Sequence, residues 1–463
     1  MRSRQKIFGF IGAFLLSFAA SGTAWAATYY VATNGSDNNA GTETSPSKTI
    51  AHAVDKMVAG DTTYVRGGTY YETRTIKFRK SGTGESSRIR LLNAPGETPK
   101  INFSQATDAR ILLSTSGQAK PIEGKPNVPV GWLTIEGFEI TKGTVAFHFI
   151  NAHDIVIRRN WIHNHFFSGF VGFGKNVLVD RNVVNRNGDF AGCSVGKLHA
   201  PNSGGSGTVC THDQGIYTTG TNWTITNNLI YQNLAYGIQV AAYPYNPDKY
   251  GHADPSYSGA SGWLIANNTI AYNNHRAGIV VWMGVANIRI INNILYENAQ
   301  VDGGVQGIDF EGGGSGHVIE NNLCYATAPG NTTCVDKDGA GRYTESGNIV
   351  NTVNPQFVNP ESGTFVEGVK NLFLLNGTPN FQLQPSSPAI DKGKGVSEVT
   401  WDHAGGKRPF GAAFDIGAYE HGAPPDSGSP PPNPTGGDFP SGGMSSPIIL
   451  RGPNGEVCPS GYL

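Results

Sequence analysis

Short apolar runs that alternate with polar residues recur along residues 215–322, and two phrases mark each recurrence. One is Gly-Ile followed by an alternating stretch, and the other is x-Ile-x-Asn-Asn. The Gly-Ile phrases begin at Gly215, Gly237, Gly278 and Gly307, and the Asn-Asn phrases end at Asn228, Asn268, Asn293 and Asn322. Short, β-branched, alternating stretches predict strands rather than helices.

The spacing of these phrases predicts a solenoid. Leaving two insertions aside, the Gly-Ile phrases recur after about 22 to 29 residues, which is a repeat-protein period. An apolar residue follows the second Asn at a fixed distance in each repeat: Ile162, Val184, Ile230, Ile270, Leu295 and Cys324. Further along comes a second polar column: His165, Asn187, Asn233, Asn273, Asn298 and Thr327.

Stacked coils place equal positions about 4.8 Å apart, so each column becomes a continuous row in the fold. The apolar row then fills the core. We expect the two Asn rows at the bends, where Asn tolerates left-handed backbone and its amide can bond the next coil. The pattern therefore predicts an all-β fold, a parallel β-helix, and no stretch between the strands fits the helices that an α/β protein would need.

A capping helix is predicted before the coils begin. Ile50, Ala53, Val54 and Met57 form one apolar helical face, which can cover the open end of the solenoid. The surrounding sequence, Tyr-Tyr-Val-Ala-Thr-Asn-Gly-Ser-Asp and then Gly-Gly-Thr-Tyr, resembles the N-terminal cap of secreted bacterial right-handed β-helix proteins. Pectate lyases of the ninth polysaccharide-lyase family are among them. The resemblance implies a right-handed parallel β-helix whose N-terminal cap comprises residues 27–72.

The ends of the chain have other compositions. Residues 1–26 carry a basic start, an apolar run and an Ala-Trp-Ala cleavage site, so they predict a secretory signal cleaved near Ala26 and a secreted or periplasmic protein. The β-helix domain is expected over residues 27–421. Its last part, 373–421, resembles the C-terminal closing segment of the same group. A Pro/Gly/Ser-rich linker follows at 422–446, and a short tail of unknown role at 447–463.

Charge and cysteine content narrow the possible partners. The net charge is -1, which gives no support for binding nucleic acid or a membrane surface, and we expect a monomer. No later segment is apolar enough to cross a membrane. Because export permits disulfides, Cys193–Cys210 and Cys324–Cys334 are candidate pairs. A buried thiol at Cys324 is the alternative, and Cys458 is left over in the tail.

Two insertions are expected to wall a groove on the Gly-Ile strands. The first, 188–214, enters the strand at Gly215, and the second, 242–262, leaves the strand that starts at Gly237. Alternation along each strand turns a set of side chains outward between these walls. The candidates for substrate binding are Gln239, Tyr243, Tyr245 and Trp282. Exposed aromatic rings suit sugars, and packing against the overhanging loops is the alternative role.

Proton transfer is the first chemistry that the groove residues suggest. His212 and Asp213 precede the first Gly-Ile strand, and Tyr217 lies on it. A His near neutral pKa can take or return a proton while a carboxylate orients it. The pair resembles the His-Asp of alginate C5-epimerases, without the Asp-Pro that flanks it there. Arg276 is the candidate for neutralising a substrate carboxylate, and Lys197 is a further candidate base.

A carboxylate pair is the second candidate. Asp309 and Glu311 lie two apart on one strand, at a spacing that suits one Ca²⁺ ion or a glycosidase pair. Three coils, about 14 Å, separate them from Asp213. The ninth-family lyases use a Lys base and an Asp cluster for Ca²⁺. In this sequence, the segment most similar to that Asp cluster is Asn187-Gly188-Asp189. The sequence signatures of polygalacturonase-type hydrolases are missing.

We therefore expect a secreted lyase that cleaves an acidic, uronic-acid polysaccharide by β-elimination in the groove. His212, Asp213, Tyr217 and Arg276 are its predicted catalytic residues, and Asp309 and Glu311 its predicted Ca²⁺ ligands. A glycoside hydrolase that uses Asp309 and Glu311 is one alternative. A non-catalytic glycan-binding or adhesin solenoid is the other.

Overall fold

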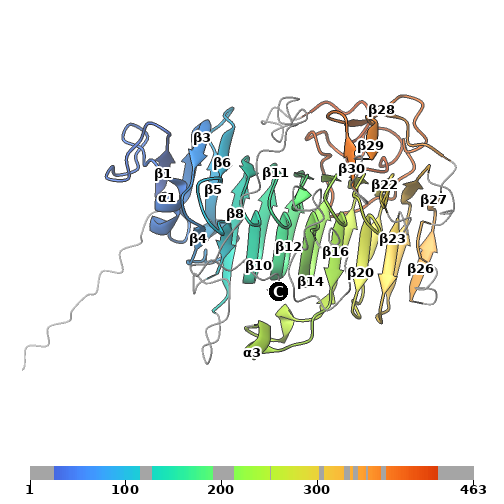
Figure 1. The fold of residues 1–463 in the computed structure, drawn as a ribbon, viewed down its shortest axis with the longest axis horizontal. Coiled ribbons are helices and arrows are strands. Elements are labelled where there is room, and N and C mark those ends of the chain that lie inside the picture. The colour runs from blue at the N-terminus through green and yellow to red at the C-terminus, as the bar shows by residue number, and fades with distance from the viewer. Residues whose placement is uncertain are drawn as a thin grey trace, which may run out of the picture.

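The chain winds into a stack of coils along one long axis (Figure 1). The computed structural model describes residues 26–114, 128–190, 213–250, 252–301, 307–327, 334–336, 342–350, 353–365 and 372–425. Within them, strands of successive coils pair in parallel and form two long sheets, A and B. This is the predicted right-handed parallel β-helix.

Sheet A carries both the Gly-Ile strands and the strands that lead to the Asn-Asn turns. Its strands are β1 (Thr28–Val31), β2 (Thr62–Val65), β4 (Ile76–Phe78), β5 (Ile89–Asn93), β7 (Ile111–Leu113), β8 (Val130–Glu136), β10 (Phe147–Arg158), β12 (Phe170–Asp180), β14 (Ile216–Thr226), β16 (Ile238–Ala241), β17 (Ala260–Ser261), β18 (Leu264–Ala266), β20 (Ile279–Trp282), β21 (Arg289–Ile291), β23 (Ile308–Glu311), β24 (His317–Glu320) and β26 (Tyr343–Ser346). The two strand types belong to one sheet because β10, β12 and β14 run through both segments without a break.

Sheet B holds the short strand that follows each Asn-Asn turn. Its strands are β3 (Gly68–Tyr71), β6 (Pro99–Asn102), β9 (Glu139–Thr141), β11 (Trp161–His163), β13 (Val183–Asn185), β15 (Leu229–Tyr231), β19 (Thr269–Ala271), β22 (Ile294–Tyr296), β25 (Leu323–Tyr325) and β27 (Ile349–Val350). The middle residue of each predicted apolar phrase points inward, from Ile162 to Cys324, and is buried. The sequence-predicted core row is confirmed.

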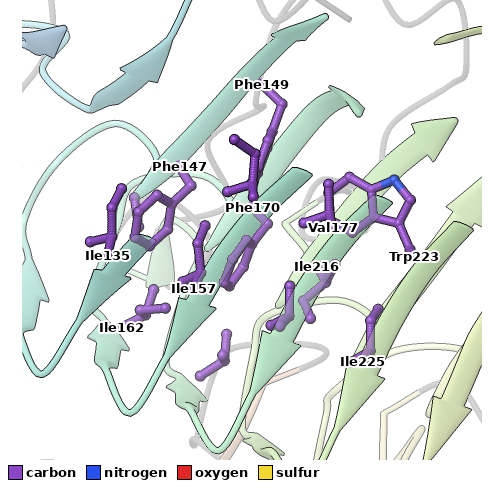
Figure 2. Close-up of a cluster of buried hydrophobic side chains, with 14 of the residues drawn as sticks. Ile135, Phe147, Phe149, Ile157, Ile162, Phe170, Val177, Ile216, Trp223 and Ile225 are labelled. Carbon is purple, nitrogen blue, oxygen red and sulfur yellow. The ribbon is translucent and has the colours of Figure 1, made fainter. Parts of the chain in front are cut away.

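Aromatic and branched side chains fill the space between the sheets. Phe147, Phe170 and Ile216 occupy the same register position on β10, β12 and β14, and Figure 2 shows them following one another from strand to strand. The rings of Phe147 and Phe170 stack with centroids 5.2 Å apart. Each coil thus buries its apolar side chains against those of the next, which is what a single repeat cannot do alone.

Glycine is required where the long strands bend. Gly220 in β14 has φ +106, and a Cβ there would lie 1.9 Å from the Gly174 carbonyl oxygen. The buried indole of Trp263 donates a hydrogen bond of 2.7 Å to the Gly220 carbonyl. The backbone of adjacent coils therefore approaches too closely at this bend for any side chain.

Both predicted Asn rows form hydrogen-bonded ladders. The side-chain amide of Asn228 donates to Asn268, Asn268 donates to Asn293, and Asn293 donates to Asn322, at 2.9, 2.9 and 3.0 Å. The second row repeats this from Asn187 through Asn233 and Asn273 to Asn298.

One detail of the Asn prediction is wrong. The left-handed residue is the one before each ladder Asn, such as Asn227 at φ 55 and Gln232 at φ 53. The backbone must turn there so that the following amide can point into the stack and bond the next coil.

The capping helix α1 (Ile50–Lys56) begins where the sequence predicts it. The Thr49 hydroxyl accepts a hydrogen bond of 3.3 Å from the His52 amide as the N-cap. The residues of its apolar face are buried: Ile50, Ala53, Val54 and Met57. α1 lies at the N-terminal end of the coils in Figure 1.

The C-terminal part covers the side of the later coils. Its antiparallel pairs are β28 (Phe357–Asn359) with β31 (Asn380–Leu383), and β29 (Gly363–Phe365) with β30 (Phe373–Leu375). Phe357, Phe373 and Phe381 pack on the outer face of sheet B, and these elements lie above β22 in Figure 1. Within the described residues, the second insertion covers part of the outer face of the Gly-Ile strands.

Candidate functional site

The predicted outward row exists. Tyr217 pairs in register with Gln239, Gln239 with Val280, and Val280 with Asp309, across β14, β16, β20 and β23. A second outward row pairs Trp282 with Glu311. The equal positions of successive repeats therefore lie side by side, as the sequence predicts.

The first insertion carries several predicted residues that lie outside the described part of the chain. These are His212, Lys197 and the Cys193–Cys210 pair. Asp213 is described and buried, and its carboxylate accepts a hydrogen bond of 3.1 Å from the Asp189 amide. That contact ties the carboxylate to the backbone at the start of the insertion. The roles of His212 and Asp213 in proton transfer stay predictions.

Gln239 is buried rather than presented on a free surface. Its side-chain oxygen accepts a hydrogen bond of 2.8 Å from the amide of Gln214, and only 7% of the residue is exposed. The Gln side chains of adjacent coils satisfy one another here, as the Asn ladders do at the bends. A role in substrate binding for Gln239 stays a prediction.

The second insertion folds back over earlier coils instead of standing as a wall. Its short helix α3 (Pro247–Tyr250) lies below β10 and β12 in Figure 1. The Ala253 amide donates to Asn151 of β10 at 3.1 Å, and Lys175 of β12 donates to Ser256 at 3.1 Å. Thr219 of β14 donates to the Gly259 carbonyl at 2.8 Å. The insertion thus crosses three strands on their outer face.

Aromatic side chains gather where this insertion meets the Gly-Ile strands. The Tyr217 and Tyr243 hydroxyls form a short hydrogen bond. Tyr243 meets Trp282 edge to face, with centroids 6.1 Å apart. The structure therefore brings three sequence-predicted residues into one cluster, although loop packing accounts for part of their burial.

Arg276 lies at the centre of a charged cluster. It precedes β20, its side chain is 49% exposed, and its guanidinium forms ion pairs with both Asp309 and Glu311 of β23. The Nε–Oδ2 distance to Asp309 is 3.6 Å. Tyr236 is a further hydrogen-bond partner of the guanidinium. Arg276 is thus directed toward the carboxylate pair of β23, while the Tyr217 hydroxyl bonds that of Tyr243.

Asp309 is the titratable group whose environment is most unusual in this cluster. Its side chain is 8% exposed. Burial, and then the negative charge of Glu311, raise the pKa of Asp309 to about 7, while Arg276 opposes the rise. Asp336 adds to it through a side-chain hydrogen bond and its own charge. A carboxyl group with such a pKa exchanges its proton near neutral pH, as an acid–base catalyst must.

The calcium expectation is not supported by the arrangement of this pair. The guanidinium already lies where a cation between Asp309 and Glu311 would bind. Among the residues the structure describes, no group of three or more His, Cys, Asp or Glu side chains is placed to hold a metal ion. Binding of Ca²⁺ here stays a prediction, and it would require Arg276 to move aside.

The second predicted disulfide is present. Cys324 and Cys334 are bonded, and both are buried at the end of the apolar row. The bond anchors the segment after Cys334, where Val335 pairs with Ile308 and the Asp336 amide donates to the Ile308 carbonyl at 2.9 Å. Asp336 therefore follows Asp309 in the outward row. The sequence offers a signal for it, because Cys334-Val335-Asp336 repeats the small–apolar–acidic order of Gly307-Ile308-Asp309.

Comparison with known proteins also supports a right-handed β-helix. A family model described as the Pel9A-like right-handed β-helix region matches residues 29–193. A family of proteins of unknown function, DUF1565, matches residues 182–334. The crystal structure of pectate lyase Pel9A is similar with a TM-score of 0.50 and 16% identity, over 85% of this chain and 96% of that chain.

Curated relatives match shorter stretches. Pectate lyase PEL9 of Emericella nidulans is 47% identical over 64 residues, which is 14% of this chain and 16% of that protein. The uncharacterized protein YwoF of Bacillus subtilis is 34% identical over 112 residues, 24% of this chain and 22% of YwoF. The chain thus matches no more than about a fifth of the length of either relative. The chain is a right-handed β-helix protein that is similar to Pel9A-like pectate lyases over part of its length, which confirms the resemblance inferred from its sequence.

None of the described helices is both long enough and apolar enough to cross a bilayer.

Proposed function

We propose that this protein is a secreted polysaccharide lyase that cleaves an acidic glycan by β-elimination at the cluster of Arg276, Asp309 and Glu311. The observation that carries the proposal is the buried carboxyl group of Asp309, held 3.6 Å from a half-exposed guanidinium. Burial and the charge of Glu311 raise the pKa of this carboxyl group to about 7. The lyase-like fold supports the reaction class. The signal sequence predicted at residues 1–26 supports export.

Arg276 is the group that would bind the uronate carboxylate. Half of its side chain is exposed, and a guanidinium presents paired N–H donors that match a carboxylate. Placing positive charge on that carboxylate stabilises the charge that develops when the neighbouring C5 proton leaves. The substrate carboxylate would have to compete with Asp309 and Glu311, because both already form ion pairs with the same guanidinium.

Asp309 is the group that would move the proton. In its ionised form it takes the proton from C5, the C5–H electron pair forms the C4–C5 double bond, and the C4–O bond breaks. The departing oxygen leaves with the electron pair of that bond and needs a proton. The newly protonated Asp309 can return its proton to that oxygen, so one carboxyl group completes the elimination.

A glycoside hydrolase is the second candidate, and one observation favours it. Asp309 and Glu311 lie two apart on β23, and burial with the nearby negative charge of Glu311 raises the pKa of Asp309. An acid that keeps its proton beside a second carboxylate is the arrangement that glycosidases use. In that reaction water adds across the bond, and the products contain no double bond.

The products decide between these reactions. We expect purified protein, incubated with pectate, alginate and glycosaminoglycans, to increase the ultraviolet absorbance of one of them, since elimination creates an unsaturated uronide. New reducing ends without that absorbance would identify a hydrolase instead. Binding without either product on every acidic glycan would leave a glycan-binding solenoid and overturn the lyase proposal.

A further inference from the structure

Aromatic rings extend from the charged cluster toward the N-terminal coils. Trp282 lies on β20, in register with Glu311, and meets Tyr243 of the second insertion. Tyr243 in turn meets Phe173 of β12 edge to face, with centroids 6.4 Å apart. The line of rings thus runs along the helix axis, across the strands, in the direction in which the insertion folds back.

Tyr245 forms an exposed platform at the far end of this line. It is 46% exposed, which is unusual for a large aromatic residue among the described ones. One face of its ring lies nearly parallel to His252, with centroids 5.9 Å apart and an interplanar angle of 19°. His252 thus lies beside the ring while nearly half of the residue stays exposed.

His252 holds the platform against the coils. It is buried and meets the Phe173 ring edge to face, at a centroid distance of 4.6 Å and an angle of 86°. Its Nδ1 accepts a hydrogen bond of 3.0 Å from the Asn246 amide, which fixes the orientation of the imidazole. Burial lowers the pKa of His252 to about 4, so the ring is neutral at neutral pH. A neutral, buried, oriented ring is a packing support for Tyr245.

We propose that Tyr245, supported by His252, is a distal subsite that stacks on the apolar face of a sugar ring in the same glycan chain that Arg276 binds. This inference rests on the proposed function. Sugar rings carry C–H groups on their faces, and a rigid aromatic ring gains by covering them. His252 is a positioning residue in this arrangement.

The location of the subsite implies a preference for long chains. Four inter-strand spacings, about 19 Å, separate β12 from β23. A glycan that reaches from Arg276 to Tyr245 must therefore lie along the helix axis and span several sugar units. A disaccharide bound at Arg276 cannot reach the platform, and the polymer can.

The matched variants are Tyr245→Ala, Tyr245→Phe and Asp248→Asn. The first removes the ring and the second keeps it, while the third changes an exposed residue of the same insertion. Affinity electrophoresis through gels containing pectate measures polymer binding, and kcat/KM is compared between the polymer and a disaccharide unit substrate. His252→Ala and His252→Phe test the support in the same assays.

We expect Tyr245→Ala to weaken polymer binding about tenfold, the usual scale of one lost stacking contact, with no change for the disaccharide. Tyr245→Phe and Asp248→Asn should bind like the unaltered protein. His252→Phe should restore part of what His252→Ala loses, because Phe returns the ring but not the acceptor for the Asn246 amide. Normal polymer binding by Tyr245→Ala would overturn the subsite, whatever the activity. Loss of binding in Tyr245→Ala without turnover by the unaltered protein would support the subsite and contradict the lyase proposal.

Discussion

Asp309→Asn is expected to lower kcat/KM on the acidic polymer by about 10²- to 10⁴-fold, the usual contribution of a general acid–base group. The amide has the shape of the carboxyl group and can still contact Arg276, but it cannot take or return a proton. The fold should be retained because the substitution changes no volume. Initial rates of ultraviolet absorbance increase measure the effect.

A charge-matched control separates chemistry from charge. Glu345→Gln removes one negative charge from β26, where the side chain is exposed. It should leave kcat/KM within about twofold, since a charge exposed to solvent is well screened. Equal losses in both variants would show that Asp309 acts only through the net charge of this end of the molecule, and its role as the proton-transfer group would be withdrawn.

Asn268→Ala is expected to cost about 2–4 kcal/mol of folding stability. Asn268 is fully buried, and its side-chain oxygen accepts two hydrogen bonds from Asn228, one from the backbone N–H and one from the side-chain amide. Its own amide donates to Asn293 and to the Ile225 carbonyl. The substitution leaves the Asn228 donors and the Ile225 carbonyl on one neighbouring coil, and the Asn293 side-chain oxygen on the other, without these hydrogen bonds. Denaturant-induced unfolding measures the loss.

The end of the same ladder supplies the control. Asn348 is only partly buried and is the last described member of the row, so water can replace part of its bonding. Asn348→Ala should cost about 1 kcal/mol or less. Similar costs at Asn268 and Asn348 would mean that the ladder contributes no more in the interior than at its end.

The stacking of rows could be predicted from the sequence because two local rules are enough. Alternation along a strand decides which side chains point outward, and a near-constant coil length decides which of them become neighbours. Tyr217, Gln239, Val280 and Asp309 follow both rules and share one row. The apolar row of Ile230, Ile270 and Leu295 follows them too, and all three are buried.

The direction of long side chains and loops could not be predicted in this way. Arg276 lies in a turn, where no alternation applies, and its guanidinium reaches β23 because two carboxylates attract it there. The second insertion turns back over β12 through contacts such as that of His252 with Phe173. Asp336 enters the outward row at the usual coil length, but its phrase begins Cys-Val instead of Gly-Ile, so the Gly-Ile pattern does not identify it.

The pH dependence of kcat/KM tests the proposed role of Asp309 most directly. Ionised Asp309 is the base, and its pKa is about 7, so the rate of elimination should rise as the pH increases through that value. Glu311→Gln removes a negative charge that raises this pKa, so its profile should shift to lower pH. A profile that falls as the pH rises, or one that Glu311→Gln leaves in place, would contradict Asp309 as the base of the elimination.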